Sequence, residues 1–233
     1  MRESAKRMIC IGRFVFPNET TRWRSTIVEA LSKERREVTI EALLVQRDDP
    51  LGIQRRVERL EEEIERFDQG QATLSLRENR FFEGRRRELV VAPSARGDAA
   101  RVQLKILTLD RFERSEELHT KCADLQPPTN IIRALNRGNH ATPLFIEIQP
   151  SGTIDSLTLN IGTSQLTYDG PLGSGDKLTL DSETNTAVLN DTENVTHLVN
   201  EFPWLEAGWN SITAVVSGSA DGVMQIEYRD LWV

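Results

Sequence analysis

Short segments with an apolar residue at every second position recur along most of the chain, and this alternation restricts the folds it can adopt. The segment REVTIEALLV, residues 36–45, places Val38, Ile40, Ala42 and Leu44 on one side of an extended chain. Successive side chains of a strand point to opposite faces of a sheet, so the pattern is typical of a strand with one buried face. The sequence therefore predicts a mainly β protein.

The first half combines such strands with one amphipathic helix. Asp48 and Asp49 before Pro50 predict the start of this helix, because aspartate caps the amides of a first turn and proline suits the first helical position. Gly70 predicts its end. Because one helix covers one face of a sheet, we expect an α+β unit with the helix on one side of an antiparallel sheet. Its apolar positions are Leu51, Ile53, Val57, Leu60, Ile64 and Phe67, and strands are expected at 7–16, 24–31, 36–45, 71–76, 85–91 and 101–109.

From Pro143 onward the sequence predicts a β-sandwich or a barrel. Alternating segments, among them 144–148, 153–161 and 223–233, are separated by turn residues at the spacing of an all-β domain. The polar sequence DSETNT is expected to join a hairpin in which Leu178 and Leu180 lie opposite Ala187 and Leu189.

Charge divides the chain into two parts. Residues 1–115 hold 24 Lys and Arg against 20 Asp and Glu, a balance of +4, whereas residues 116–233 hold 5 against 16, a balance of −11. Such a split favours two units with different partners. We expect a first domain at 1–115 and a second domain at 116–233, in which 116–142 is a connecting segment. Arginine is mixed with glutamate in the first part, which argues against a nucleic-acid-binding stripe.

The sequence holds no motif for catalysis, for a metal or for a cofactor. His119 and Cys122 form only half of a metal site, and Cys10 and Cys122 are expected to be buried free thiols. No apolar stretch approaches the length of a membrane span, and Gly12 with Arg13 interrupts the N-terminal apolar run, so folding is expected in the cytoplasm. The aspartates of the second half are expected in turns and on outer strand faces: Asp169, Asp176, Asp181 and Asp191.

Two surface features are candidates for binding. The cluster Arg85, Arg86 and Arg87 is either a solvated turn or part of a protein interface, where arginine is enriched. The stretch EFPWLEAGWN, residues 201–210, predicts a tight corner in which Leu205 plugs the end of the sandwich. Pro203 fixes one backbone dihedral, Gly208 permits a left-handed conformation, and Asn210 can bond back to turn amides. Trp204 and Trp209 either pack at the rim or stack on a ligand.

The second half resembles the C-terminal part of phage distal tail proteins, which lie in the baseplate of long-tailed, non-contractile phages. The resemblance rests on the run from Gly175 through Asp176 to Asp181, on NDTENVTH, on P-x-L-x-x-G-x-N from Pro203 to Asn210, and on the closing IEYRDLWV. It implies an N-terminal belt-type domain that assembles into a ring, followed by a galectin-like β-sandwich. The first half, which leads into LDRFERSEE, is similar to a belt domain. The long arms and inserted sugar-binding modules that the family often has find no room here.

The resemblance implies a structural virion protein that is not an enzyme. It would form a homo-hexameric ring between the tail tube protein and the tail hub or tip protein, with DNA only passing through the lumen and no membrane partner. It would be assembled in the host cytoplasm and located in the virion tail.

Two other functions stay open from the residues alone. The first is a carbohydrate-binding module in which Trp204, Trp209, Tyr168 or Trp232 stacks on sugar rings. The second is a glycoside or peptidoglycan hydrolase, which needs two carboxylates in a cleft. The sequence offers no such pair.

Overall fold

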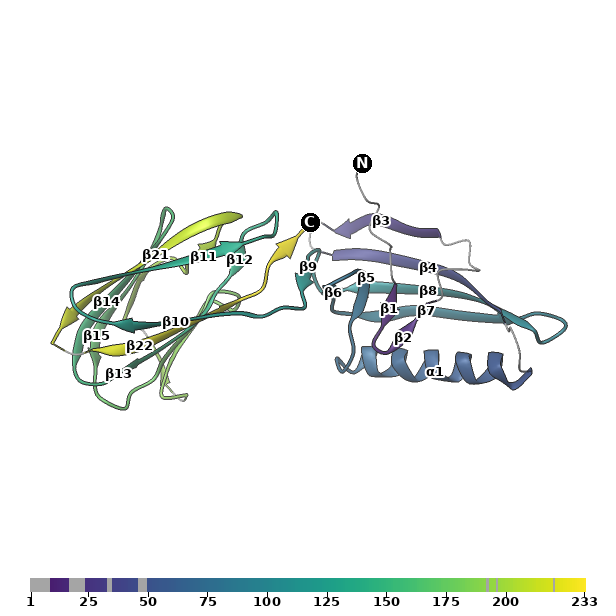
Figure 1. Cartoon of the computed structure of the whole chain (residues 1–233), viewed down its shortest axis with the longest axis horizontal. Helices are drawn as coiled ribbons and strands as arrows, with labels where there is room; N and C mark the ends of the chain where they lie inside the picture. Colours follow the sequence, from purple (N-terminus) through teal and green to yellow (C-terminus); the bar gives the residue numbers. More distant parts are fainter. Residues whose placement is uncertain are drawn as a thin grey trace. The chain divides into compact units, whose positions relative to one another are not determined.

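The chain divides into two compact units, Met1–Glu116 and Glu117–Val233. The computed structural model describes residues 9–16, 24–32, 35–45, 50–191, 193–195, 197–219 and 221–233. Strands dominate both units, and one helix is found in the described ranges (Figure 1). The prediction of a mainly β protein with an α+β first unit is confirmed. Each unit is described by itself below.

The first unit contains two antiparallel sheets and a helix. One sheet has four strands in the order β3-β4-β8-β7, and the other contains β2-β1-β5-β6-β9. Helix α1 (Pro50–Asp68) contacts β1, β2, β4, β7 and β8. The strands are β1 (Cys10–Ile11), β2 (Phe14–Val15), β3 (Arg24–Ser32), β4 (Arg35–Val45), β5 (Leu74–Arg77), β6 (Arg80–Phe82), β7 (Gly84–Pro93), β8 (Ala99–Thr108) and β9 (Glu113–Ser115).

The helix and β4 bury the faces that the apolar patterns predicted. Val38, Ile40 and Leu44 are fully buried. On α1, Leu60 and Phe67 are buried in the same core cluster, and the charged residues of the helix surround them. Gly70 ends the helix with a φ of 72°, and its amide donates to the carbonyl of Phe67 at 3.0 Å. This left-handed ending is a Schellman motif. Asp48 and Asp49, the predicted caps, lie outside the described residues.

The strand expected at 7–16 is a short hairpin, β1–β2, and not one continuous strand. Gly12 turns the chain with a φ of 51°. A Cβ at this position would lie 2.0 Å from Oε2 of Glu63 and would displace that flexible carboxylate, so the left-handed conformation is the main reason for glycine here. The same carboxylate oxygen accepts a hydrogen bond from the amide of Arg13 at 3.2 Å. The alternating pattern therefore identified the extended residues, but it did not identify the turn between them.

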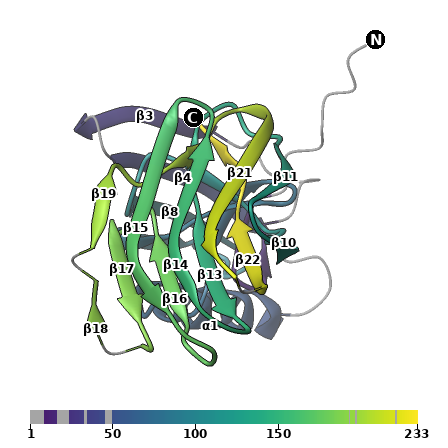
Figure 2. The same cartoon turned by 90° about the vertical axis from the view of Figure 1, so that its left-hand side faces the viewer.

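The second unit is a β-sandwich. One sheet has the order β10-β22-β13-β16-β17-β18, the other β11-β21-β14-β15-β19, and β12 pairs with β20 in a small ribbon (Figure 2). Buried side chains from both sheets form one hydrophobic cluster. The strands are β10 (His119–Leu125), β11 (Thr129–Asn136), β12 (Thr142–Pro143), β13 (Phe145–Pro150), β14 (Ile154–Ile161), β15 (Ser164–Leu172), β16 (Leu178–Asp181), β17 (Thr186–Leu189), β18 (Glu193–Asn194), β19 (Leu198–Asn200), β20 (Trp204–Leu205), β21 (Gly208–Gly218), β22 (Gly222–Tyr228) and β23 (Leu231–Trp232).

Residues 116–142, expected as a connecting segment, instead supply one strand to each sheet. β10 pairs along β22, and β11 pairs along β21. The sequence QPPTN is the tight corner between these two strands, and Asn130 closes it. Its side-chain amide donates to the carbonyl of Gln126 at 2.8 Å, and its side-chain oxygen accepts from the Gln126 amide at 3.1 Å. The Pro and Asn residues of this stretch predicted a linker. Linkers and tight corners between strands share this composition, so the sequence alone did not distinguish them.

The predicted hairpin of the second unit is confirmed in its register. Leu178 lies opposite Leu189, and Leu180 lies opposite Ala187. All four residues contribute to the sandwich core or pack against it. Asp181 accepts hydrogen bonds from the backbone amides of Glu183 and Thr184 at 2.8 and 3.3 Å, and this stabilises the turn between the strands.

Because each unit has its own core cluster, we expect core truncations to act separately. Leu60→Ala, at a position that is 0% exposed, is expected to lower the unfolding free energy of the first unit by about 2–5 kcal/mol. Ile226→Ala, also 0% exposed, is the matched change in the second unit. Differential scanning calorimetry should show that each variant shifts a different transition. If both variants move one common transition equally, the two cores are not independent.

Candidate functional site

The outer face of the four-stranded sheet in the first unit carries paired charges. Lys105 Nζ lies 2.5 Å from Glu88 Oε2, and Arg87 NH1 lies 2.6 Å from Glu37 Oε2. These four side chains line an open hollow of about 480 Å³. Each cation in the hollow already has a carboxylate partner, so the hollow has no excess charge with which to attract an ionic ligand. Its chemistry is that of a polar surface and not of a reaction centre.

The arginine cluster divides into residues with different surroundings. Arg86 is bound to the end of α1: its Nε lies 3.1 Å from Asp68 Oδ2, and its backbone amide donates to Asp68 Oδ1 at 2.6 Å. Arg87 pairs with Glu37, although its side chain is still 54% exposed. Arg85 is exposed, and no ion pair is found for it within the described ranges. The cluster lies on β7, which is an edge strand of its sheet, so it is not a solvated turn.

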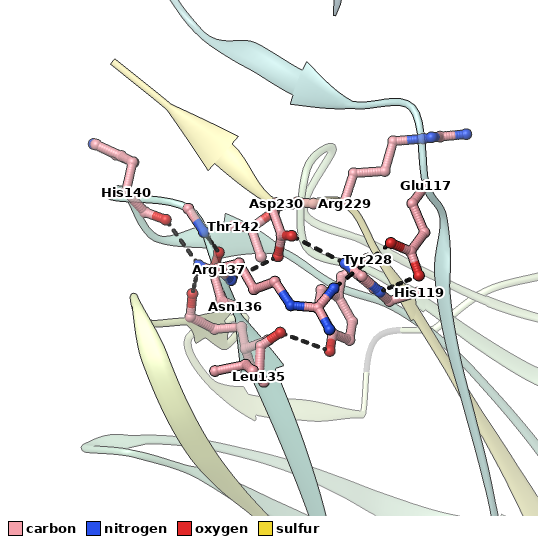
Figure 3. A network of polar contacts seen from close by, with 12 residues as sticks. Glu117, His119, Leu135, Asn136, Arg137, His140, Thr142, Tyr228, Arg229 and Asp230 are labelled. Atoms are coloured by element: carbon pink, nitrogen blue, oxygen red, sulfur yellow. Dashed lines mark hydrogen bonds and ion pairs between the residues drawn. The ribbon is translucent and has the colours of Figure 1, made fainter. Parts of the chain in front are cut away.

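A buried polar network lies at one end of the sandwich in the second unit (Figure 3). The carboxylate of Asp230 is 4% exposed, lies 3.0 Å from His119 Nε2 and accepts a hydrogen bond from the Arg137 amide at 2.9 Å. Glu117 lies 3.5 Å from His119 Nδ1 and 3.6 Å from Arg137 NH1. The ring of Tyr228 lies 4.9 Å from the His119 ring. Three segments distant in the sequence are therefore held together by polar contacts.

The same end of the unit is fixed by backbone contacts to its last residues. Asn136 donates through Nδ2 to the carbonyls of His140 and Leu205, at 2.8 and 3.1 Å. The amides of Asn139 and His140 donate to the carbonyl of Leu231. A Cβ on Gly138 would lie 2.1 Å from that carbonyl oxygen, so the loop approaches the chain as closely as only glycine allows. These contacts hold Asp230 and Leu231 against the loop at residues 136–140, and we call this set of contacts the clasp.

Sequence reasoning missed this clasp. Asp230 and Asn136 are the polar residues that interrupt otherwise apolar alternating runs, and Gly138 lies two residues after Asn136. That interruption is the only signal in the sequence, because the partners are about 90 or more residues apart. Burial raises the pKa of Tyr228, whose hydroxyl donates to the carbonyl of Leu135 at 3.1 Å. No nucleophilic side chain is placed by these contacts against the His119–Asp230 pair.

The residues of the family signature hold turns. Asp176 Oδ2 accepts from the Gly173 amide at 2.7 Å, and its Oδ1 accepts from Asn190 Nδ2 at 2.9 Å. These two hydrogen bonds lower the pKa of Asp176, the one from Asn190 more strongly. Gly175 adopts a φ of 90°, which favours glycine. Through these hydrogen bonds, Asp176 joins the start of β16 to the end of β17.

The EFPWLEAGWN stretch is the predicted corner. Leu205 is 0% exposed and lies in the sandwich core, and Gly208 has a φ of 95°. Pro203 is buried. Asn210 donates through Nδ2 to the carbonyls of Glu206 and Gly208, at 2.8 and 3.0 Å. The expectation that Asn210 bonds to turn amides is wrong, since it satisfies the turn carbonyls instead.

The structure separates the two tryptophans of this corner. Trp204 is 37% exposed and lies on β20, opposite Pro143. Trp209 is 74% exposed and lies on β21, opposite Leu135. Only Trp209 therefore shows most of its surface to solvent.

The described residues contain no group of His, Cys, Asp and Glu side chains suited to hold a metal. His119 faces Asp230, whereas Cys122 faces Gln225 with its Sγ 3.9 Å from Oε1. Both cysteines are free, but Cys122 is exposed and Cys10 is half-buried, so the expectation of two buried thiols is wrong. Cys122 lies on the outer face of β10, where the alternation leaves it in solvent. No helix in the described part of the chain is long and apolar enough to cross a membrane.

Comparison with known proteins identifies the second unit. Residues 137–232 match the model of the siphovirus-type tail component, C-terminal domain. This range contains Arg137, the corner at residues 201–210 and Asp230. The second unit is thus similar to the C-terminal domain of siphovirus-type tail components.

The fold of the chain is similar to a solved structure over nearly its full length. The crystal structure of the Dit protein (gp 19.1) of SPP1, described as a paradigm of the hub adsorption apparatus in phages that infect Gram-positive bacteria, matches with a TM-score of 0.60. The match covers 97% of this chain and 94% of that chain at 12% sequence identity, a level at which the likeness shows the fold. No curated protein matches the chain.

The turn held by Asp176 generates a prediction about pH. Asp176→Ala removes both hydrogen bonds and is expected to lower the unfolding free energy at pH 7 by about 0.5–1 kcal/mol, allowing for solvent screening. Because the folded pKa is lowered, this contribution is complete above the unfolded pKa of about 3.9 and disappears as pH falls through the folded pKa. Urea unfolding at pH 7 and near pH 2.5 should show a smaller difference at the lower pH. An equal difference at both would contradict the role of the ionised carboxylate.

Proposed function

We propose that this chain is a phage distal tail protein and that it forms a homo-hexameric ring joining the tail tube to the tail tip, with the first unit making the contacts between subunits. The observation that carries the proposal is the open four-stranded sheet β3-β4-β8-β7. Its edge strands β3 and β7 have 9 and 10 residues, and within the described ranges each pairs on one side only. Long unpaired edges invite pairing with another chain.

An edge-to-edge contact between β7 of one copy and β3 of the next is heterologous. Such a contact uses two different surfaces of the same chain, and it generates a closed ring when the rotation between copies divides a full turn. In a ring built this way every edge strand is paired, whereas a single open sheet leaves its two edge strands unpaired. The mixed charge of the first unit supports this packing, because paired charges on β4, β7 and β8 avoid repulsion between neighbouring copies.

The direction of the free hydrogen-bonding groups on β7 follows from the β7–β8 hairpin. The amide of Ser94 donates to the carbonyl of Ala99 at 2.8 Å, and the register then places Ala92, Val90 and Glu88 opposite Arg101, Gln103 and Lys105. In an antiparallel pair the residues alternate between those that bond to the partner and those that do not. The amides of Leu89 and Val91 therefore point away from β8, toward the open edge. Pro93, which has no amide hydrogen, occupies the next position of this outward set.

This geometry provides a substitution that removes an outward amide and little else. Val91→Pro deletes the donor at the centre of the open edge, whereas Val91→Thr keeps it in a side chain of similar shape. Multi-angle light scattering of the wild type and of Val91→Thr is expected to give the mass of six chains of 26.4 kDa each. Val91→Pro is expected to shift the population to monomers, while its circular dichroism spectrum stays that of a folded β protein.

Assembly on a partner is tested in the same experiment. The wild-type chain is examined alone and mixed with purified tail tubes of its phage, and negative-stain images are recorded in both cases. Rings in either sample support the proposal. A chain that stays monomeric in both samples, or a Val91→Pro variant that forms rings as readily as the wild type, would contradict it.

A further inference from the structure

One outer face of the sandwich differs in chemistry from the rest of the acidic second unit. The side chains that alternate outward on β11, β21, β14 and β15 include one arginine, Arg133, and one carboxylate, Asp169. Asp169 and the exposed Asp155 of the β14 bulge lie near Ser217, at the end of the sheet away from Trp209. The other outward residues form what we call the Trp209 face, which holds no carboxylate: Thr129, Ile131, Arg133, Leu135, Thr158, Asn160, Gln165, Thr167, Trp209, Ser211, Thr213 and Val215. The outer face of the opposite sheet carries four carboxylates, from Asp124, Glu147, Asp181 and Glu227.

Trp209 is the most exposed large apolar side chain described in the chain. It is 74% exposed, and Ile131 on the neighbouring strand is 66% exposed. An aromatic side chain of this size gains substantially from burial, so its exposure on a flat strand is unfavourable without a ligand or partner. Its neighbours in the sheet are Leu135, directly opposite, and Ser211 on the same strand, which lies opposite Arg133.

Uncharged hydrogen-bonding groups continue the face across the sheet. Thr213 lies opposite Asn160, and Asn160 lies opposite Gln165. Gln165 donates to the Asn160 side chain at 2.8 Å, and the hydroxyls of Thr158 and Thr167 lie 3.1 Å apart. These contacts fix the side-chain directions, because each group is held by a neighbour in the adjacent strand. Hydroxyl and amide groups of this kind bind well to other neutral hydroxyl groups, since no charge loses its hydration.

We propose that the Trp209 face binds a neutral polysaccharide. The indole ring stacks on the C–H face of a sugar ring, and Ser211, Arg133 and the groups around Asn160 bind the hydroxyls of the same chain. A polyanion is disfavoured, because residues 116–233 carry a balance of 5 basic against 16 acidic residues. A protein partner is disfavoured because most groups around Trp209 and Asn160 are polar, whereas the centre of a protein interface is apolar.

The proposal does not depend on ring formation, since all the residues of the face belong to one chain. An open face with one stacking ring makes a weak site, and we expect a Kd of about 0.1–1 mM for a single chain. This affinity is measurable by gel retardation on an immobilised polymer, where many sugar units are present.

The test uses native affinity gels that contain hydroxyethyl cellulose, galactomannan, dextran or, as the charged comparison, polygalacturonate. The full-length wild-type chain is expected to be retarded by at least one neutral polymer and not by polygalacturonate. Trp209→Ala should weaken this binding at least tenfold, and Trp209→Phe should restore part of it. Trp204→Ala is the matched control, because it removes the other exposed tryptophan of the same corner and should change the binding less than twofold.

The role of the polar groups is tested separately from that of the ring. Thr213→Val keeps the shape of the side chain but removes one hydroxyl, so it is expected to weaken retardation two- to fivefold without a change in melting temperature. Three results would overturn the proposal: no retardation by any neutral polymer, equal retardation of wild type and Trp209→Ala, or loss of binding in Trp204→Ala alone. Protection of Trp209 from oxidation by a neighbouring tail protein, without glycan binding, would assign the face to a protein partner.

Discussion

The arrangement of this protein depends on one constraint: a strand that buries every second side chain leaves the others on an outer face that the core does not determine. In β4, Val38, Ile40 and Leu44 fill the core, and the residues between them are free to vary. Each sheet therefore has an outer face with its own chemistry, while the inner faces all pack into a hydrophobic core. The four-stranded sheet of the first unit carries ion pairs, one sheet of the sandwich carries carboxylates, and the other carries hydroxyls, amides and Trp209. Function in a chain without a catalytic site is expected in these outer faces and in the sheet edges.

The ends of the sheets impose a second requirement, because backbone groups there lose their ladder partners and must be satisfied by other groups. Side chains meet this requirement at several places in the second unit. Asn136 and Asn210 donate to free carbonyls, Asn130 closes the corner between the first two strands, and Asp176 accepts from a loop amide. Asp230 adds a hydrogen bond with His119 at the end where the unit begins and finishes. These contacts explain why Gly, Asp, Asn and Pro recur at the turns of this unit.

Local patterns predicted the elements whose structure is decided locally. The amphipathic helix, its end at Gly70 and the hairpin around DSETNT all follow from neighbours in the sequence, and the structure confirms them. The same reasoning failed where distant residues decide. QPPTN has the composition of a linker, but pairing of β10 with β22 and of β11 with β21 makes it a tight corner. The arginine run was recognised in the sequence, but the different partners of its members could not be predicted. Arg86 pairs with Asp68 at the end of the helix, and Arg87 pairs with Glu37 on another strand. The clasp around Asp230 was missed for the same reason, and the separation of Trp204 from Trp209 depends on which strands they join.

Ring formation and glycan binding, the two proposals, would act together through multivalency. A single weak site on an open sheet face gives little adhesion, but copies held in one assembly bind a polymer with an effective concentration set by their spacing. A polysaccharide presents many equivalent units, so several faces can bind it at once and the complex dissociates only when all have released. The weakness of one site then has an advantage, because each contact breaks readily and the assembly can move along the polymer while staying bound. An edge variant that leaves the chain monomeric would retain the single-site affinity and lose this gain, whereas a Trp209 variant would keep the ring and lose the affinity itself.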